Sequence, residues 1–281
     1  MAVSALLIKT QPTYDIKLPR DLAVPDKSKT LDFDPGRLET WAARNCYGET
    51  ERVVSSVSGL VRRISFPEFS QALGRCISSL PKGLDKRCVV LTSEHKSNQW
   101  VAEVAKAHHQ FNSNYLSLGH DHASDFVAYL DRTPAAKCPK EIVLFDDASF
   151  SGNQMTNHVN AIKAKLLEKG VTCNIRVIVP FATRVALDRL QNIRPEGDVN
   201  ISVHCDQVIP TIKEQLPQDD FQILDAYSEE TWGVSLLNPD NIEQDSGIAG
   251  VYFDHKIPNK QSFILSIFAR ETMPRISPPY T

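Results

Sequence analysis

Between Arg87 and His204 the sequence alternates short apolar runs with segments whose apolar residues recur at helical spacing. Short apolar runs are typical of strands buried on both faces, and the other spacing is typical of helices that bury one side. Alternation in units of this length requires right-handed crossovers and a mostly parallel sheet. We therefore predict an α/β fold with a doubly wound, mostly parallel sheet, in which ligands bind beyond the carboxyl ends of the strands.

The individual elements can be placed along the chain. Strands are expected at Cys88–Thr92, Asn114–Leu118, Ile142–Phe145, Asn174–Pro180 and Asn200–His204. Helices between them are expected at Ser97–His108, His122–Leu130, Ser151–Lys169 and Ala182–Leu190. Outside this region the expected elements are helices at Arg37–Cys46, Thr50–Arg63, Pro67–Leu80 and Ile209–Leu216, and a strand at Ile248–Phe253.

Composition limits the classes of function. With 281 residues, of which 42% are hydrophobic and 23% charged, the chain has the make-up of a soluble globular protein. No run approaches the roughly 18 apolar residues that predict a membrane span, and a net charge of −3 does not predict general binding to nucleic acids. The cysteines include no Cys-x-x-Cys pair, so we expect reduced thiols in a cytoplasmic protein rather than disulfides or a zinc cluster.

The most specific stretch of the sequence runs from Glu141 to Met155. Four apolar residues end in Asp146 and Asp147, and a short loop then leads through Gly152 into a helix. The unpaired N–H groups and the positive dipole end at a helix N-terminus favour a phosphate group. Carboxylates at the end of a strand favour ribose hydroxyls or a hard cation such as Mg²⁺. Together these features predict a site for a ribose 5-phosphate.

The segment Ile142–Gln154, which reads IVLFDDASFSGNQ, resembles the thirteen-residue phosphoribosyl pyrophosphate signature of type I phosphoribosyltransferases. In that family four apolar residues and two acids precede three variable positions and a Thr-Gly or Ser-Gly pair. The order of strands and helices over about Arg87–His204 is similar to that of the family core. The resemblance implies a divergent member, because Phe150 stands where many members have an acid, and Asn153-Gln154 stands where many have Gly-Thr.

The resemblance also implies roles for individual residues. Asp146 and Asp147 would be the catalytic acids and would hold Mg²⁺. Contacts to the ribose and the 5-phosphate are expected from Asp146, Asp147, Ala148, Ser149, Phe150, Ser151, Gly152 and Asn153. Pyrophosphate binding is expected at Lys96 and Ser97 after the first core strand, with a solvated lysine as the alternative. Base binding is expected at Asp254 and Lys256, with a surface ion pair as the alternative.

The change of pattern along the chain divides it into three predicted domains. Residues 1–85 would form an N-terminal arm and helical extension, residues 86–206 the phosphoribosyltransferase-like core, and residues 207–281 a hood-like region that sets substrate specificity. The expected partner is a small molecule, either phosphoribosyl pyrophosphate or a nucleotide, with no membrane and no general nucleic-acid partner. A homodimer is a possible assembly.

The leading hypothesis is an Mg²⁺-dependent enzyme that transfers a phosphoribosyl group to or from a base or another acceptor, which the sequence does not identify. The alternative is a non-catalytic regulatory protein on the same fold that senses phosphoribosyl pyrophosphate or a nucleotide, and Phe150 favours it. A third hypothesis is a phosphohydrolase with an aspartyl nucleophile. That class needs an Asp-x-Asp pattern, which the sequence Asp146-Asp147-Ala148-Ser149 lacks.

Overall fold

The computed structural model of the protein describes residues 35–93, 97–118, 122–232, 235–236 and 250–253. Contacts divide the described chain into two compact units. The first unit is Pro67–Val208, and the second consists of the described residues before Pro67 and after Val208. Each unit has its own cluster of buried apolar side chains.

The first unit is built around a five-stranded sheet. Its strands lie in the order β3-β2-β4-β6-β8, and all neighbouring pairs are parallel. The bounds are β2 Val89–Ser93, β3 Asn114–Leu118, β4 Glu141–Phe145, β6 Cys173–Ile178 and β8 Val199–His204. The predicted α/β fold with a parallel central sheet is confirmed.

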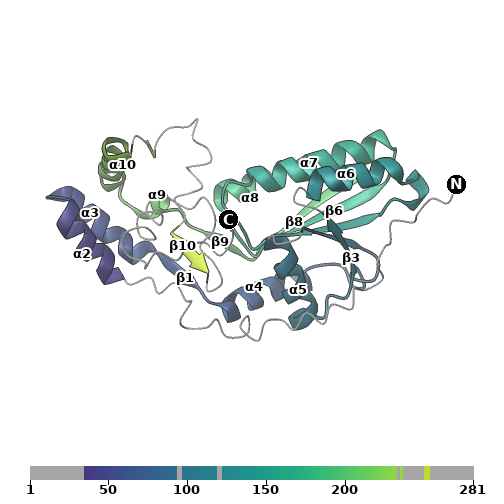
Figure 1. Ribbon diagram of the computed structural model, residues 1–281, viewed down its shortest axis with the longest axis horizontal. Helices are drawn as coiled ribbons and strands as arrows, with labels where there is room; N and C mark the ends of the chain where they lie inside the picture. Colours follow the sequence, from purple (N-terminus) through teal and green to yellow (C-terminus); the bar gives the residue numbers. More distant parts are fainter. Residues whose placement is uncertain (1–34, 94–96, 119–121, 233–234, 237–249, 254–281) are drawn as a thin grey trace. The chain divides into compact units, whose positions relative to one another are not determined.

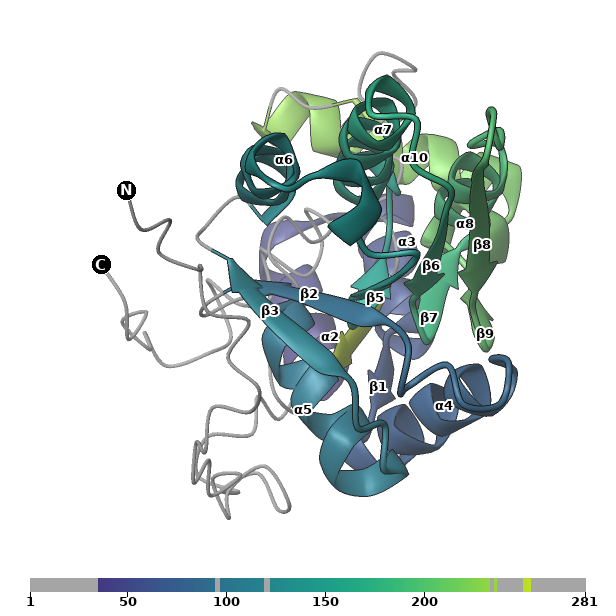
Figure 2. The same ribbon diagram turned by 90° about the vertical axis from the view of Figure 1, so that its right-hand side faces the viewer.

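Helices cover both faces of this sheet (Figure 1, Figure 2). Three of them lie on one face and two on the other. The first group is α6 His122–Arg132, α7 Asn153–Glu168 and α8 Arg184–Gln191, and the second is α4 Phe66–Ser78 and α5 Ser97–His109. The chain moves from β2 out to β3 and then back past β2 to β4. The carboxyl edge between β2 and β4 is therefore a topological switch point, where open α/β sheets bind their ligands.

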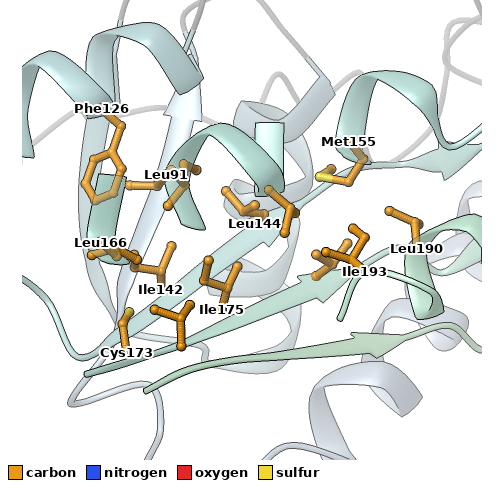
Figure 3. Packing of buried hydrophobic residues seen from close by; sticks show 14 of the residues in the cluster. Leu91, Phe126, Ile142, Leu144, Met155, Leu166, Cys173, Ile175, Leu190 and Ile193 are labelled. Carbon is orange, nitrogen blue, oxygen red and sulfur yellow. The ribbon is translucent and has the colours of Figure 1, made fainter. Parts of the chain in front are cut away.

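The apolar run of β4 is buried from both sides, as predicted. Each residue from Ile142 to Phe145 is at most 1% exposed. Ile142 and Leu144 pack into the cluster under α6 and α7, where Leu166 also lies (Figure 3). Side chains alternate along a strand, so Phe145 faces the other way and meets the ring of Phe111 edge-on, with the ring centroids 5.8 Å apart. A strand held in this way fixes the position of the residues that follow it.

A second, three-stranded sheet continues the carboxyl ends of three main strands. Its members are β5 Ala148–Ser149, β7 Phe181–Thr183 and β9 Gln207–Ile209, in the order β5-β7-β9. They begin after breaks of two residues that follow β4, β6 and β8 respectively. Asp146 and Asp147 fill the first of these breaks. The helix expected at Ala182–Leu190 begins only at Arg184, because Phe181–Thr183 forms β7; three residues are too few for a recognisable strand pattern.

The second unit contains helices and one pair of short strands. Its helices are α2 Pro35–Asn45, α3 Glu49–Val57, η1 Ser58–Leu60, α9 Ile212–Gln215 and α10 Gln218–Trp232. Strand β1, Arg62–Ile64, pairs in parallel with β10, Val251–Phe253. The guanidinium of Arg52 donates two hydrogen bonds, of 3.0 and 2.6 Å, to the carboxylate of Asp220. These contacts join segments that lie far apart in the sequence.

Two predictions for this unit need correction, and one helix was missed. The helix expected over Thr50–Arg63 ends earlier, because Arg62–Ile64 is drawn into a strand by its pairing with Val251–Phe253. The helix expected at Ile209–Leu216 is shorter, and α10 was not predicted at all. Across the described ranges of both units, the helices lack the length and apolar character needed to cross a membrane.

One close contact between helices of the first unit gives a pH-dependent prediction. A Cβ atom added to Gly74 in α4 would lie 2.7 Å from Cε1 of His109 in α5, so the ring fills the space above the glycine. Burial, helped by the charge of His108, lowers the pKa of His109 below its ordinary value of 6.5. The unfolded chain therefore binds a proton more readily than the folded one, and the free energy of unfolding falls as the pH drops below about 6.5.

Replacing His109 with glutamine removes this titrating group. We expect the H109Q variant to lose less stability than the wild type between about pH 8 and pH 5.5. Urea midpoints at the two pH values measure this, and equal losses in both proteins would contradict it.

Candidate active site

The two predicted acids lie at the switch point, just beyond the end of β4. Asp146 is partly exposed, whereas Asp147 is only 4% exposed. An oxygen of Asp147, Oδ1, accepts a hydrogen bond of 2.9 Å from the N–H of Ala148. The carboxylate of Asp147 is thus partly engaged by the backbone, and Asp146 is the more accessible acid for a ligand.

The structure brings Ser97 to Asp146, although the two residues are far apart in the sequence. The hydroxyl of Ser97, the first residue of α5, donates to Oδ1 of Asp146 at 2.7 Å. The N–H of Asp147 donates to the same oxygen at 3.0 Å. At the end of β2, the buried amide of Asn98 accepts a hydrogen bond of 3.1 Å from the N–H of Ser93 and fixes the start of α5. The first helix after β2 therefore begins directly beside the acid pair.

The residues expected to contact the ribose and the 5-phosphate span a short strand, a loop and the start of a helix. Ala148 and Ser149 belong to β5, so the loop proper is Phe150–Gly152, and α7 begins at Asn153. Gly152 is the N-cap, with a φ of 72°. A Cβ at Gly152 would lie 3.0 Å from the carbonyl oxygen of Ala186. Both the left-handed backbone and this close approach require glycine.

The side chain of Ser151 makes one local bond at the start of α7. The hydroxyl of Ser151 accepts a hydrogen bond of 3.3 Å from the N–H of Asn153. The N-cap is Gly152 rather than Ser151, and it has no side-chain cap bond. The first turn of α7 therefore presents backbone N–H groups that an anion can bind.

Two residues from the next βα unit also contact this loop, and sequence reasoning missed both. The hydroxyl of Thr183, the N-cap of α8, donates to the carbonyl oxygen of Phe150. The guanidinium of Arg189 donates to the carbonyl oxygen of Ser151 at 2.6 Å and to the side-chain oxygen of Asn153. A threonine before a helix is a readable cap signal, but no local pattern marks Arg189, because the contact depends on how the chain crosses the sheet.

Three of the predicted site residues cannot be placed: Lys96, Asp254 and Lys256 lie outside the described residues.

The carboxylates of Asp146 and Asp147 suit Mg²⁺, which prefers carboxylate and phosphate oxygens and usually keeps several water ligands. Within the described ranges there is no cluster of three or more His, Cys, Asp or Glu side chains able to hold a metal ion. An Mg²⁺ ion at Asp146 and Asp147 would therefore take most of its ligands from substrate and water.

Comparison with known proteins agrees with this arrangement. Residues 66–232 match the model of the family described as PRTase-CE, and this is 167 of the 281 residues. The matched segment begins with α4 and ends with α10, so it includes every strand of the main sheet and the whole acid and loop segment. No curated protein matches the chain. The chain belongs to the PRTase-CE family, which is phosphoribosyltransferase-like.

Proposed function

We propose that the protein binds phosphoribosyl pyrophosphate together with Mg²⁺ and transfers the phosphoribosyl group to or from an acceptor. The observation that carries the proposal is the 2.7 Å hydrogen bond between Ser97 and Asp146. This bond brings the N-terminus of α5 to the acid. Along the chain, the acid is followed directly by the phosphate loop and the N-terminus of α7. Two anion-binding helix ends beside a carboxylate suit a sugar with a phosphate at one end and a pyrophosphate at the other.

Each part of the site has a distinct chemical task in this proposal. The loop Phe150–Gly152 and the first turn of α7 anchor the 5-phosphate, and this remote binding positions the reacting carbon. Asp146 binds the ribose hydroxyls. As the bond from ribose C1 to pyrophosphate breaks, positive charge develops on the sugar, and the carboxylate of Asp146 stabilises it. Ser97 and the start of α5 receive the pyrophosphate.

Mg²⁺ would be held by the carboxylates of Asp146 and Asp147. When bound, it neutralises charge on the pyrophosphate leaving group. The protein carries a net charge of −3, so a cation is the natural means of bringing a highly anionic substrate to two aspartates.

The proposal is tested with the whole 281-residue chain. Calorimetry with phosphoribosyl pyrophosphate, with and without Mg²⁺, should give saturable binding that the metal strengthens. Release of pyrophosphate should then appear with at least one member of a panel of nucleobases and amines. A wild-type protein that binds neither phosphoribosyl pyrophosphate nor ribose 5-phosphate would refute the proposal.

A single substitution tests the contact that carries the proposal. Ser97→Ala removes the hydroxyl that donates to Asp146 at 2.7 Å. A hydrogen bond to a charged group contributes about 1.5–3 kcal/mol, and each 1.4 kcal/mol is a factor of about ten, so we expect affinity for phosphoribosyl pyrophosphate to fall about 10- to 100-fold. Ser97→Thr keeps a hydroxyl at the same place and is the matched control. Equal affinities of the alanine and threonine variants in calorimetry would count against a role for the hydroxyl.

The sensing function remains as a second candidate because of Phe150. This position carries no acid that could assist a nucleobase, and its carbonyl oxygen is taken by Thr183. A sensor would bind phosphoribosyl pyrophosphate tightly and release no pyrophosphate with any acceptor on the panel. The same two measurements therefore separate an enzyme from a regulatory protein.

A further inference from the structure

One side of α8 and its cap faces the phosphate loop. Thr183, Ala186 and Arg189 are spaced by three residues, and side chains at that spacing share a helix face. Thr183 contacts Phe150, the backbone of Ala186 approaches Gly152, and Arg189 contacts Ser151 and Asn153. Every residue of the loop and the first residue of α7 therefore meets this one face.

The contacts of Thr183 and Arg189 constrain how the peptide groups of the loop are oriented. Both donate to backbone carbonyl oxygens, those of Phe150 and Ser151 respectively. A trans peptide is planar, and its N–H points opposite to its C=O. With these two carbonyls turned toward α8, the N–H groups of Ser151 and Gly152 point to the side away from α8.

This orientation matters for an anion. Carbonyl oxygens repel a phosphate group, whereas backbone N–H groups bind it. Without a donor at Thr183 or Arg189, a carbonyl of the loop would lose its partner and could rotate toward the anion. Arg189 is also only partly buried and places a positive charge beside the loop, which favours a phosphate electrostatically.

We infer that Thr183 and Arg189 are positioning residues of the phosphate loop, which hold its carbonyls against α8 so that its N–H groups face the 5-phosphate. The inference rests on the proposed function. It adds that recognition of the 5-phosphate depends on the βα unit that follows the signature segment, and not on that segment alone.

The experiment compares Arg189→Met with Arg184→Met. Arg184 is on the same helix and is exposed, so it controls for the loss of an arginine. At metal sites, removing a residue that orients a ligand commonly costs about 10- to 100-fold in affinity, and we expect an effect of similar size here. We expect Arg189→Met to lose at least about tenfold in affinity for ribose 5-phosphate by calorimetry and to keep its affinity for inorganic pyrophosphate. Arg184→Met should resemble the wild type for both probes.

A second pair of variants addresses Thr183, which also caps α8 through a bond from the N–H of Ala186. Thr183→Val removes the hydroxyl at nearly constant shape, whereas Thr183→Ser keeps the hydroxyl and removes only the methyl group. We expect the valine variant to lose affinity for ribose 5-phosphate and the serine variant to recover most of it. Loss of affinity for both ribose 5-phosphate and pyrophosphate would indicate general disruption instead and would overturn the inference.

Hydrogen exchange without ligand separates this inference from the proposed function. Amides of residues 150–156 should exchange faster in Arg189→Met than in the wild type and in Arg184→Met. Unchanged exchange there would overturn the inference whatever ligand the protein binds. If instead exchange rises but the wild type does not bind ribose 5-phosphate, α8 holds the loop while both the proposed function and the role in phosphate binding are wrong.

Discussion

Replacing both Asp146 and Asp147 with asparagine is expected to abolish release of pyrophosphate from phosphoribosyl pyrophosphate. The change removes the two negative charges at the end of β4 that would stabilise the developing charge on the ribose. Loss of one such electrostatic group commonly costs about 10²–10³-fold in turnover, so we expect the double variant to fall by about 10³-fold or more. A coupled assay of pyrophosphate with the best acceptor from the panel measures it.

The fold of this double variant should survive, which makes the result interpretable. Asparagine keeps a side-chain oxygen that can accept the bonds from the N–H groups of Asp147 and Ala148. Asp188→Asn is a suitable control, because Asp188 is exposed on α8 and lies outside the predicted site. Pyrophosphate release by the double variant at the rate of the control would end the proposed mechanism.

Substitution of Gly152 by alanine should damage both stability and phosphate binding. A residue with a Cβ at a φ of 72° is strained by about 1–2 kcal/mol. The new Cβ would also lie 3.0 Å from the carbonyl oxygen of Ala186, and forcing atoms into packed space commonly costs about 1–3 kcal/mol. We expect G152A to lower the free energy of unfolding by about 2–5 kcal/mol and to lose most affinity for ribose 5-phosphate. Urea titration and calorimetry measure the two effects.

The other end of the same helix offers a matched control. Gly170 follows α7 with a φ of 62°, and nothing lies within 4 Å of the position of its Cβ. G170A therefore carries the backbone strain without the collision, and we expect a loss of only about 1–2 kcal/mol with unchanged ligand affinity. If G152A and G170A have the same stability and the same affinity, the approach of α8 to the loop has no energetic importance.

The sequence was most informative where structure is determined by neighbouring residues. The run Ile142–Phe145 is apolar at every position because both faces of β4 are covered, and the predicted strand at Asn114–Leu118 matches β3 in both bounds. The acid pair and Gly152 could be located because a strand end, a loop and a helix start follow one another directly. Ser97 was expected near the site only through the family resemblance, and the contact of its hydroxyl with Asp146 is seen in the structure alone.

The prediction failed where the signal was interrupted or distant. The buried residues of α10 include Asp225 and Ser228 beside Phe221 and Leu224, so no continuous apolar face marked the helix. Pro217 followed by acids in the first turn is the one start signal that the sequence offers for this helix. Strand β1 depends on a partner near the other end of the chain, which no local window contains.

The contacts of Thr183 and Arg189 determine when, during synthesis, the phosphate loop can take its final conformation. During synthesis the segment Ile142–Gln154 is made first, and Thr183 and Arg189 follow their loop partners Phe150 and Ser151 by 33 and 38 positions. Domains generally acquire their structure as units while the chain is made. A nascent chain that ends within α7 would contain the whole segment Ile142–Gln154 but neither Thr183 nor Arg189. The proposed site for a sugar phosphate would therefore be complete only after α8 has been made.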